Sequence, residues 1–451
     1  MNDSHKLSRR AFLRTSSMVA MGVALAACAP VNPAAPAASS GDSAAAAPSS
    51  EKISLRMHAR IGQQEDTLYD MQIPKFMAEN PNIEVVKESF PGAEYNAKIS
   101  TMVAGGTLGD VVWSALGGAT IQFAYAQNTI QAVDDLVASN NVDLKQWYEG
   151  CLKGITVDGK LLGLPFKSHP GLAFVYFNQS LFEEAGLELP KSGWTQDQHV
   201  EAAKALNKSD ANPPVYGFYP GIPNIWKTMV TLVRAFGDQL VSEDGTTFQI
   251  TSPKAMQAVT WLYDLHHTHK VSPLPDQIVG APNDMWAAGG LATYQGGSSV
   301  SVTASTIGDK FKWMVAPNAV GPGGVGGSDY EVDAQCVTTA TQHPNEAFQW
   351  VQYLCSKDSG IQLGLIGGTV GGRPDVYGSE ELLAFPFRVV FKEVMDNAQA
   401  SRITANWRQS EAEAALAQLM QPLWTGEEKP TEGFIGNVST QIQDIMSKPK
   451  P

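Results

Sequence analysis

The chain has 451 residues, a formal net charge of −13 at neutral pH and 43% hydrophobic residues. A single hydrophobic core rarely extends beyond about 250–300 residues, so this length predicts two lobes. The excess of carboxylates argues against nucleic acid as a partner, because such a surface repels phosphates.

Residues 1–27 have the layout of an export signal. The uncharged run Thr15–Ala27 is 13 residues long, too short for a permanent membrane helix, which needs about 20. The paired arginines in Ser8–Arg14 resemble the twin-arginine export motif. Leu25–Cys28 resembles the lipobox of bacterial lipoproteins, in which the chain is cut before a lipidated cysteine. We therefore expect Cys28 to carry a lipid anchor; the alternative is an ordinary signal peptide with a chance cysteine.

Residues 28–51 are predicted to form a disordered linker. Ala29–Ser50 consists mostly of Ala, Ser, Pro and Gly, so it cannot bury enough apolar surface to offset the entropy of ordering. No later stretch is apolar enough to span a membrane. We expect a protein tethered by lipid to the outer face of the cytoplasmic membrane, in the periplasm or the extracellular space.

Strands and helices alternate after the linker, which predicts an α/β protein with a parallel sheet. In such sheets, ligands bind beyond the carboxyl ends of the strands, here Arg60–Glu65 and Trp113–Gly118. The elements expected first are strands at 53–57, 83–87 and 110–113, and helices at 68–77 and 95–103.

Turn and capping signals mark the following elements. Asp158-Gly159 predicts the turn of a hairpin, and Thr195 with Gln198 predicts a helix that opens with a capping box. Further helices are expected at Pro253–His267, Asn345–Ser356 and Gly433–Ser447, and strands at 172–178, 290–299 and 312–319.

Three cysteines follow Cys28, so at most one internal disulfide can form. Cys151, Cys336 and Cys355 show no Cys-x-x-Cys spacing, which argues against a zinc or redox motif. We expect Cys336 and Cys355 to be buried thiols, while any pairing that involves the three stays open.

Two other motifs could bind a metal or a dinucleotide, but a purely structural role is favoured for both. His266, His267 and His269 have no Cys or carboxylate at metal-ligand spacing and suit a helix C-terminus. Gly321–Gly326 fits Gly-x-Gly-x-x-Gly, but no helical pattern follows it, so a flexible loop is expected instead of a dinucleotide site. We expect no metal and no cofactor.

Six motifs occur in an order that resembles one known family. They are GTLGDVVW, DGKLLGLPF, LAFVYFNQSLFEEAGLELP, SGWTQDQHVEAAKAL, HPNEAFQWVQYLCSKDSGIQL and GGTVGGRPDV. Together they span nearly all of the predicted mature chain. The order resembles that of the extracellular solute-binding proteins of bacterial ABC importers, in the group typified by maltose- and other sugar-binding proteins. In the fourth motif, Trp194-Thr195 reverses the family's usual order.

This resemblance implies the type II periplasmic-binding-protein fold, in which two α/β lobes joined by hinge crossings clamp a ligand. Carried over, lobe one comprises residues 52–168 and 308–370, and lobe two comprises 171–305 and 372–448. The crossings are expected near Lys167–Gly171, near Thr306–Lys310 and near Gly371.

The resemblance also implies a ligand site between the lobes. Sugar binders stack aromatic rings on the CH face of a pyranose and bond its hydroxyls with polar side chains. Trp226 and Trp407 are expected to stack from lobe two; the alternative for each aromatic is a core position, and for each polar residue an exposed or ion-paired one. The predicted set is Arg60, Gln63, Gln64, Trp113, Ser114, His169, Trp226, Tyr294, Ser298, Arg373, Trp407 and Arg408.

The function expected is solute capture without catalysis, with delivery to a membrane permease of an ABC importer. The resemblance favours a carbohydrate as the solute, and we expect a monomer. If the arginines converge, the cleft is basic, which would favour an anionic sugar. The alternative is a lipid-anchored hydrolase acting on glycans, which needs a carboxylate pair. The predicted cleft residues include few acids, which favours binding.

Overall fold

The computed structural model describes residues 52–62, 64–116, 120–222, 225–328, 330–397 and 406–449. The chain divides into two units, residues 1–50 and 51–451, and the described residues all belong to the second. The predicted export signal, Cys28 and the linker therefore lie outside the described residues. So does Gln63, one of the predicted ligand-binding residues.

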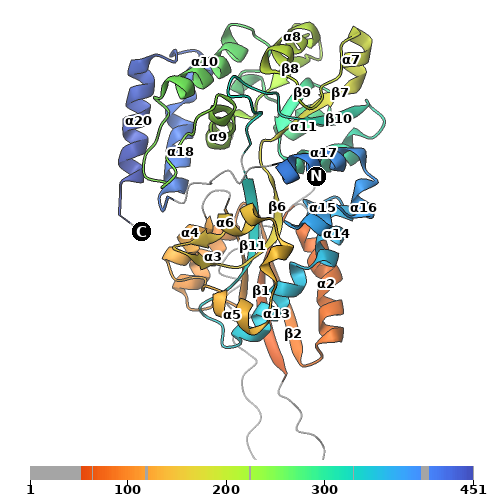
Figure 1. Cartoon of the computed structure of the whole chain (residues 1–451), viewed down its shortest axis with the longest axis vertical. Coiled ribbons are helices and arrows are strands. Elements are labelled where there is room, and N and C mark those ends of the chain that lie inside the picture. The colour runs from red at the N-terminus through yellow and green to blue at the C-terminus, as the bar shows by residue number, and fades with distance from the viewer. Residues whose placement is uncertain are drawn as a thin grey trace, which may run out of the picture. The chain divides into compact units, whose positions relative to one another are not determined.

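A five-stranded sheet with the strand order β2–β1–β3–β11–β6 forms the first half of the core (Figure 1). As the alternation of elements predicts, β1 pairs in parallel with β2 and with β3. β11 runs antiparallel to both β3 and β6. The strands are β1 (Ile53–Ile61), β2 (Ile83–Pro91), β3 (Val111–Ala115), β6 (Leu164–Pro170) and β11 (Tyr330–Val337).

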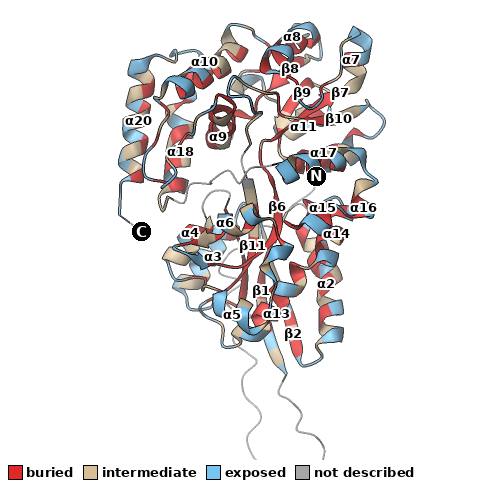
Figure 2. Cartoon of the chain, viewed as in Figure 1, coloured by how far each residue is buried: buried red, intermediate tan, exposed pale blue. Residues whose placement is uncertain are grey.

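Helices pack on this sheet through apolar side chains. Leu55 and Met57 of β1 are buried, and Trp350 donates its indole N–H to the Met57 sulfur at 3.2 Å. Figure 2 shows the strands largely buried and the outer helix faces exposed. The helices are α2 (Glu65–Glu79), α3 (Tyr95–Ala104), α4 (Thr120–Ala126), α5 (Asp134–Ser139), α6 (Glu149–Gly154), α13 (Pro344–Leu354) and α14 (Lys357–Leu365).

A four-stranded sheet with the order β10–β7–β9–β8 forms the second half. β8 and β9 are parallel, and the other pairs are antiparallel. The strands are β7 (Phe174–Asn178), β8 (Tyr216–Tyr219), β9 (Leu291–Gly296) and β10 (Trp313–Pro317). The helices are α7 (Gln179–Ala185), α8 (Gln196–Leu206), α9 (Ile225–Ala235), α10 (Pro253–His267), α11 (Pro282–Ala287), α12 (Ala304–Ile307), α17 (Pro386–Asn397), α18 (Gln409–Leu419), α19 (Gln421–Thr425) and α20 (Glu432–Met446).

The chain passes between the sheets from β6 to β7 and again from β10 to β11. β10 pairs with β7, with Trp313 opposite Asn178. The second passage therefore follows Pro317, whereas the prediction placed it earlier, near Thr306–Lys310. The third passage follows α14, where α15 (Pro374–Tyr377) and α16 (Glu380–Leu383) precede α17. There the Tyr377 hydroxyl donates to the Ser168 carbonyl of β6 at 2.8 Å.

Several local predictions are confirmed. Thr195 and Gln198 form a reciprocal capping box at the start of α8. Asp158-Gly159 joins β4 (Thr156–Val157) to β5 (Lys160–Leu161) in an antiparallel hairpin. Cys336 and Cys355 are buried thiols, as expected, and Cys151 is buried as well.

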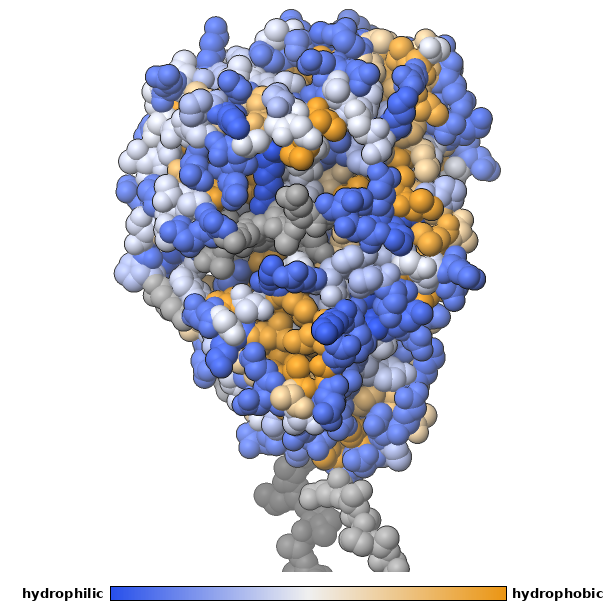
Figure 3. Space-filling view, viewed as in Figure 1, coloured by the Kyte–Doolittle hydropathy of each residue, from blue (hydrophilic) through white to orange (hydrophobic). Residues whose placement is uncertain are grey.

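The described chain contains no helix that is both long enough and apolar enough to span a membrane. The face of the protein in Figure 3 is mostly hydrophilic, with separate apolar patches.

Candidate functional site

Charged residues gather at one edge of the first sheet. β1, β3 and β6 end at this edge, and β11, which runs antiparallel to β3 and β6, begins there. The register places Asp333 opposite Lys167 and Glu331 opposite His169. Because side chains alternate along a strand, Glu331 and Asp333 project from the same face of β11. This is the edge where ligands of α/β proteins bind.

Lys167 lies between two carboxylates in the most buried part of the cluster. Its side chain is 2% exposed and forms ion pairs with Glu65, which is fully buried, and with Asp333 at 2.6 Å. Burial alone lowers the pKa of Lys167, but the charges of Asp333 and Glu65 outweigh burial and raise the pKa above its usual range. Lys167 therefore stays charged and holds both carboxylates in place.

Glu331 connects this cluster to a helix of the second half. It forms an ion pair with Lys227 of α9, and its Oε2 lies 3.6 Å from His169 Nε2. Burial alone raises the pKa of Glu331, but the positive charge of Lys227, together with the nearby His169, outweighs burial and lowers the pKa to about 2. The carboxylate is thus ionised at physiological pH, and its ion pair with Lys227 links α9 to the first sheet.

Arg60 and Trp113, both predicted site residues, lie against each other at the same edge. The Arg60 Cζ is 4.7 Å from the centroid of the Trp113 ring, and its Nη1 is 3.4 Å from Glu65 Oε1. Tyr95 packs edge-on against Trp113, with ring centroids 5.6 Å apart. Within the described chain, the Trp113 indole N–H has no hydrogen-bond partner. It therefore remains available as a donor.

Trp113 also lines a pocket of about 260 Å³ between α3 and α4. Ile99, Val103 and Phe123 supply apolar surface, while Asn96 and other residues supply amide and hydroxyl groups. None of the described residues that line this pocket is charged. Such a surface suits an uncharged solute that presents both CH groups and hydroxyls.

A turn from the second sheet also reaches the cluster. A Cβ added at Gly297 would lie 3.7 Å from His169 Cε1, and the Tyr176 hydroxyl donates to the Gly297 carbonyl at 2.9 Å. The neighbouring Ser298 is buried, and its hydroxyl has no partner among the described residues. Ser298 and His169 are therefore predicted site residues that the fold brings close together.

Trp226 lies in the hydrophobic core, which contradicts the prediction that it stacks on a ligand. It is 4% exposed and belongs to a core cluster formed by α9, α10, α18 and α20. Its ring stacks on Phe248, with centroids 5.7 Å apart. The apolar face of α9 turns this side chain inward, so Trp226 is removed from the candidate site.

Other predicted residues lie apart from the cluster or have local partners. Arg373 pairs with Asp375 at 2.9 Å, and its Cζ lies 5.1 Å from the centroid of the Trp147 ring. Arg408 pairs with Glu411 at 2.6 Å. The others are Tyr294, whose hydroxyl donates to Asn283; Trp407, half-buried against the main core; and Gln64, exposed at the start of α2. Ser114, in contrast, is buried and lines the same pocket as Trp113.

A basic cleft would have required the predicted arginines to converge, but Arg373 and Arg408 pair with carboxylates elsewhere. Glu65, Glu331 and Asp333 accompany the cations of the cluster. Sequence analysis placed Glu65 on the binding edge but not among the site residues, and it gave no place to Glu331, Asp333 or Lys227. A signal was present, because Glu331 and Asp333 alternate with the buried residues Val332 and Ala334. The three carboxylates pair with Lys167, Lys227 and Arg60, so the cluster is close to electroneutral.

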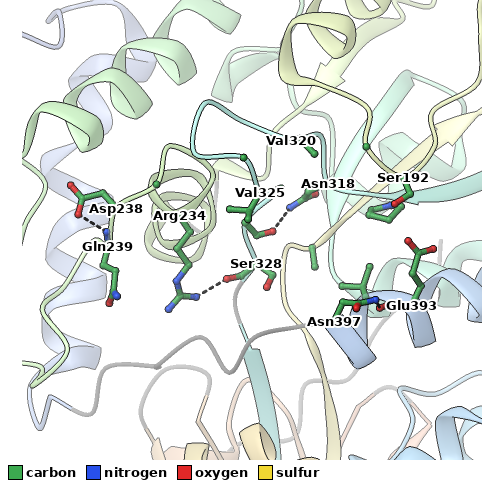
Figure 4. Close-up of a pocket in the computed structure, with 18 of the residues that line it drawn as sticks. Ser192, Arg234, Asp238, Gln239, Asn318, Val320, Val325, Ser328, Glu393 and Asn397 are labelled. Carbon is green, nitrogen blue, oxygen red and sulfur yellow. Dashed lines mark hydrogen bonds between the residues drawn. The ribbon is translucent and has the colours of Figure 1, made fainter.

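A larger pocket, of about 860 Å³, lies beside the connection from β10 to β11 (Figure 4). In the figure Arg234 points toward Ser328, to whose carbonyl it donates at 2.6 Å. The glycine-rich Gly321–Gly326 motif belongs to this connection. The pocket contains none of the predicted ligand-binding residues, so it is not part of the candidate site.

The histidine motif lies at the C-terminal end of α10. No group of three potential ligands occurs in the parts of the chain that the structure describes. His267 instead contacts the Leu423 carbonyl through Nε2 at 2.8 Å, and His266 is buried.

Comparison with known proteins identifies the family. The sequence profile described as bacterial extracellular solute-binding protein matches residues 61–361, so the chain belongs to this family. The family is one of solute-binding proteins and not of enzymes, which decides against the hydrolase alternative. A binding protein of Brucella abortus is 22% identical over 398 residues, covering 83% of this chain and 88% of the relative.

Solved structures show the same two-lobed fold. A substrate-binding protein of an ABC transporter from Listeria monocytogenes, solved with cycloalternan, is 18% identical, with a TM-score of 0.75. The match covers 88% of this chain and 100% of the Listeria chain. The maltose-bound MalE3 of T. maritima is 22% identical, with a TM-score of 0.72, and covers 87% of this chain and 100% of its own.

Proposed function

We propose that this protein captures an uncharged, sugar-like solute between its two lobes and delivers it to the permease of an ABC importer. The observation that carries the proposal is the ion pair between Lys227 of α9 and Glu331 of β11. This ion pair joins the two halves of the molecule at the edge of the first sheet, where Trp113 and the uncharged pocket also lie. Maltose in a protein of the same fold supports a sugar as the solute.

The chemistry of this edge suits hydroxyl groups. Charged donors and acceptors form strong hydrogen bonds with neutral hydroxyls, and the paired charges give no net attraction for an ionic solute. The pocket between α3 and α4 adds apolar contacts for a sugar CH face. We expect the lobes to close on the solute by a hinge motion at the three connecting segments.

A thermal-shift screen with neutral sugars, oligosaccharides, sugar acids and polyamines tests the solute class. We expect a neutral sugar to raise the melting temperature, because a ligand at 100 times its Kd adds about 2.7 kcal/mol of stability. Trp113→Phe keeps a ring but removes the indole donor, and it should weaken sugar binding about tenfold.

Trp261→Phe serves as the control for that variant, because Trp261 lies on α10 and is half-buried. It should leave sugar affinity unchanged. Stabilisation by polyamines or sugar acids alone would show that the proposed solute class is wrong.

We further propose that Cys28 anchors the protein to the outer face of the membrane through lipid. This rests on the lipobox and on the Ala- and Ser-rich residues that follow it. Cys28→Ala should move the protein from salt-washed membranes to the soluble fraction, because the anchor is lost. Cys151→Ala, which changes a buried thiol, should remain with the membranes. A Cys28→Ala protein that still sediments with washed membranes would contradict the anchor.

A further inference from the structure

A separate cavity of about 220 Å³ lies among the helices of the second half. It is bounded by the end of β8, the start of α9, the loop after α10, and helices α18 and α19. It shares no lining residue with the charged cluster or with the pocket that contains Trp113. Its occupant therefore need not be the solute.

The lining of this cavity is mostly apolar. Ile222 and Ile225 form one side, and Ala417 and Trp424 form another. None of the described residues that line it is an Asp, Glu, Lys or Arg. Cavities of about 150 Å³ with aliphatic lining bind benzene, so the space suffices for a small ring.

Two buried polar groups in this lining lack partners. Neither ring nitrogen of His266 makes a hydrogen bond of acceptable geometry to the described residues, although the Pro273 carbonyl lies near. The hydroxyl of Tyr219 is likewise unsatisfied within the described chain. His266 is 4% exposed and Tyr219 is 2% exposed. Buried groups without partners are unfavourable, so an occupant that bonds them stabilises the fold.

Both groups are uncharged at physiological pH. Burial, with a contribution from the neighbouring His267, lowers the pKa of His266 to about 3. A neutral imidazole offers one N–H donor and one acceptor nitrogen, and a tyrosine hydroxyl offers both functions. A hydroxyl group in the occupant can donate to one of these residues and accept from the other, whereas a carboxylate would be buried without a counter-ion.

We propose that this cavity is a second binding site, which takes a small uncharged molecule with an apolar ring and one hydroxyl group. The ring packs against Ile222, Ile225 and Trp424. The hydroxyl bonds His266 and Tyr219. The site does not depend on the identity of the transported solute, because it uses none of the residues proposed to bind that solute.

Phenol is the probe for the test, with benzene and benzoate as comparison compounds. Binding to the full chain is measured by ligand-observed NMR and by thermal shift. We expect phenol to bind and to raise the melting temperature, benzene to bind about tenfold more weakly because it lacks the hydroxyl, and benzoate not to bind. Absence of phenol binding at millimolar concentration would overturn the proposal and leave ordered water as the occupant.

Two variants locate the binding. His266→Phe keeps an aromatic ring but removes both nitrogens, and it should weaken phenol binding about tenfold. Ala417→Leu fills the cavity and should abolish phenol binding even if His266→Phe does not fold.

His199→Phe is the matched control. His199 is also a buried neutral histidine, but its Nε2 bonds the Thr293 hydroxyl at 2.9 Å and it does not line the cavity. This variant should bind phenol like the wild type. Unchanged phenol affinity in both His266→Phe and Ala417→Leu would show that phenol binds elsewhere and would overturn the proposal.

Discussion

Replacing Lys167 with methionine should lower the free energy of unfolding by about 3–5 kcal/mol, because it leaves buried carboxylates without their counter-ion. Glu65 is fully buried, and Asp333 is mostly buried. After the substitution, Arg60 remains near Glu65 at 3.4 Å, but the central cation is lost. Urea unfolding, followed by fluorescence of the chain's tryptophans, measures the change.

A double variant and a control at an exposed ion pair make this test specific. Lys167→Met combined with Glu65→Gln should recover part of the loss, because one of the unpaired charges is then removed. Lys312 pairs with Glu183 at 3.5 Å, but both side chains are largely exposed, so Lys312→Met should change stability by less than about 1 kcal/mol. If Lys167→Met were as mild as Lys312→Met, the buried cluster would not support the fold.

Trp226→Ala should destabilise the protein by about 3–5 kcal/mol, because it removes a large side chain from a packed core. Trp226 is 4% exposed and stacks on Phe248. The melting temperature without ligand should fall clearly, while the affinity of the remaining folded protein for a sugar should stay within about twofold, a change of less than about 0.5 kcal/mol.

Trp261→Ala provides the comparison for that truncation. Trp261 is half-buried and meets Phe218 edge-on, with ring centroids 6.4 Å apart. Its loss should destabilise the protein less than the loss of Trp226. A Trp226→Ala protein that melts like the wild type but binds sugar poorly would show that Trp226 belongs to the binding site after all.

Elements that depend on local sequence could be predicted. The alternation in Ile53–Met57 identified β1, and Thr195 with Gln198 identified the start of α8, because a capping box needs only residues three positions apart. The place of β10 could not be predicted in this way. Its apolar pattern does not indicate which of the two sheets it joins, and only pairing with β7 decides between them.

The candidate site was harder to predict, because its partners are distant in sequence. A lysine such as Lys167 is normally exposed, and its burial is explained only by Glu65, which lies 102 residues away. Trp226 was misplaced for another reason. Trp226, Met229 and Val233 form one buried stripe on α9, and this helical spacing was a core signal that the resemblance to sugar-binding proteins outweighed.

The position of β11 in the first sheet has a consequence for how the chain folds. β11 lies between β3 and β6, yet it follows all four strands of the second sheet along the chain. Thr338, which follows it directly, bonds Gly109 from 229 residues away, and such non-local contacts form slowly. Until β11 is synthesised, β3 and β6 present open edges to other chains. Truncated or slowly translated chains that end before Tyr330 are therefore the forms most prone to aggregate.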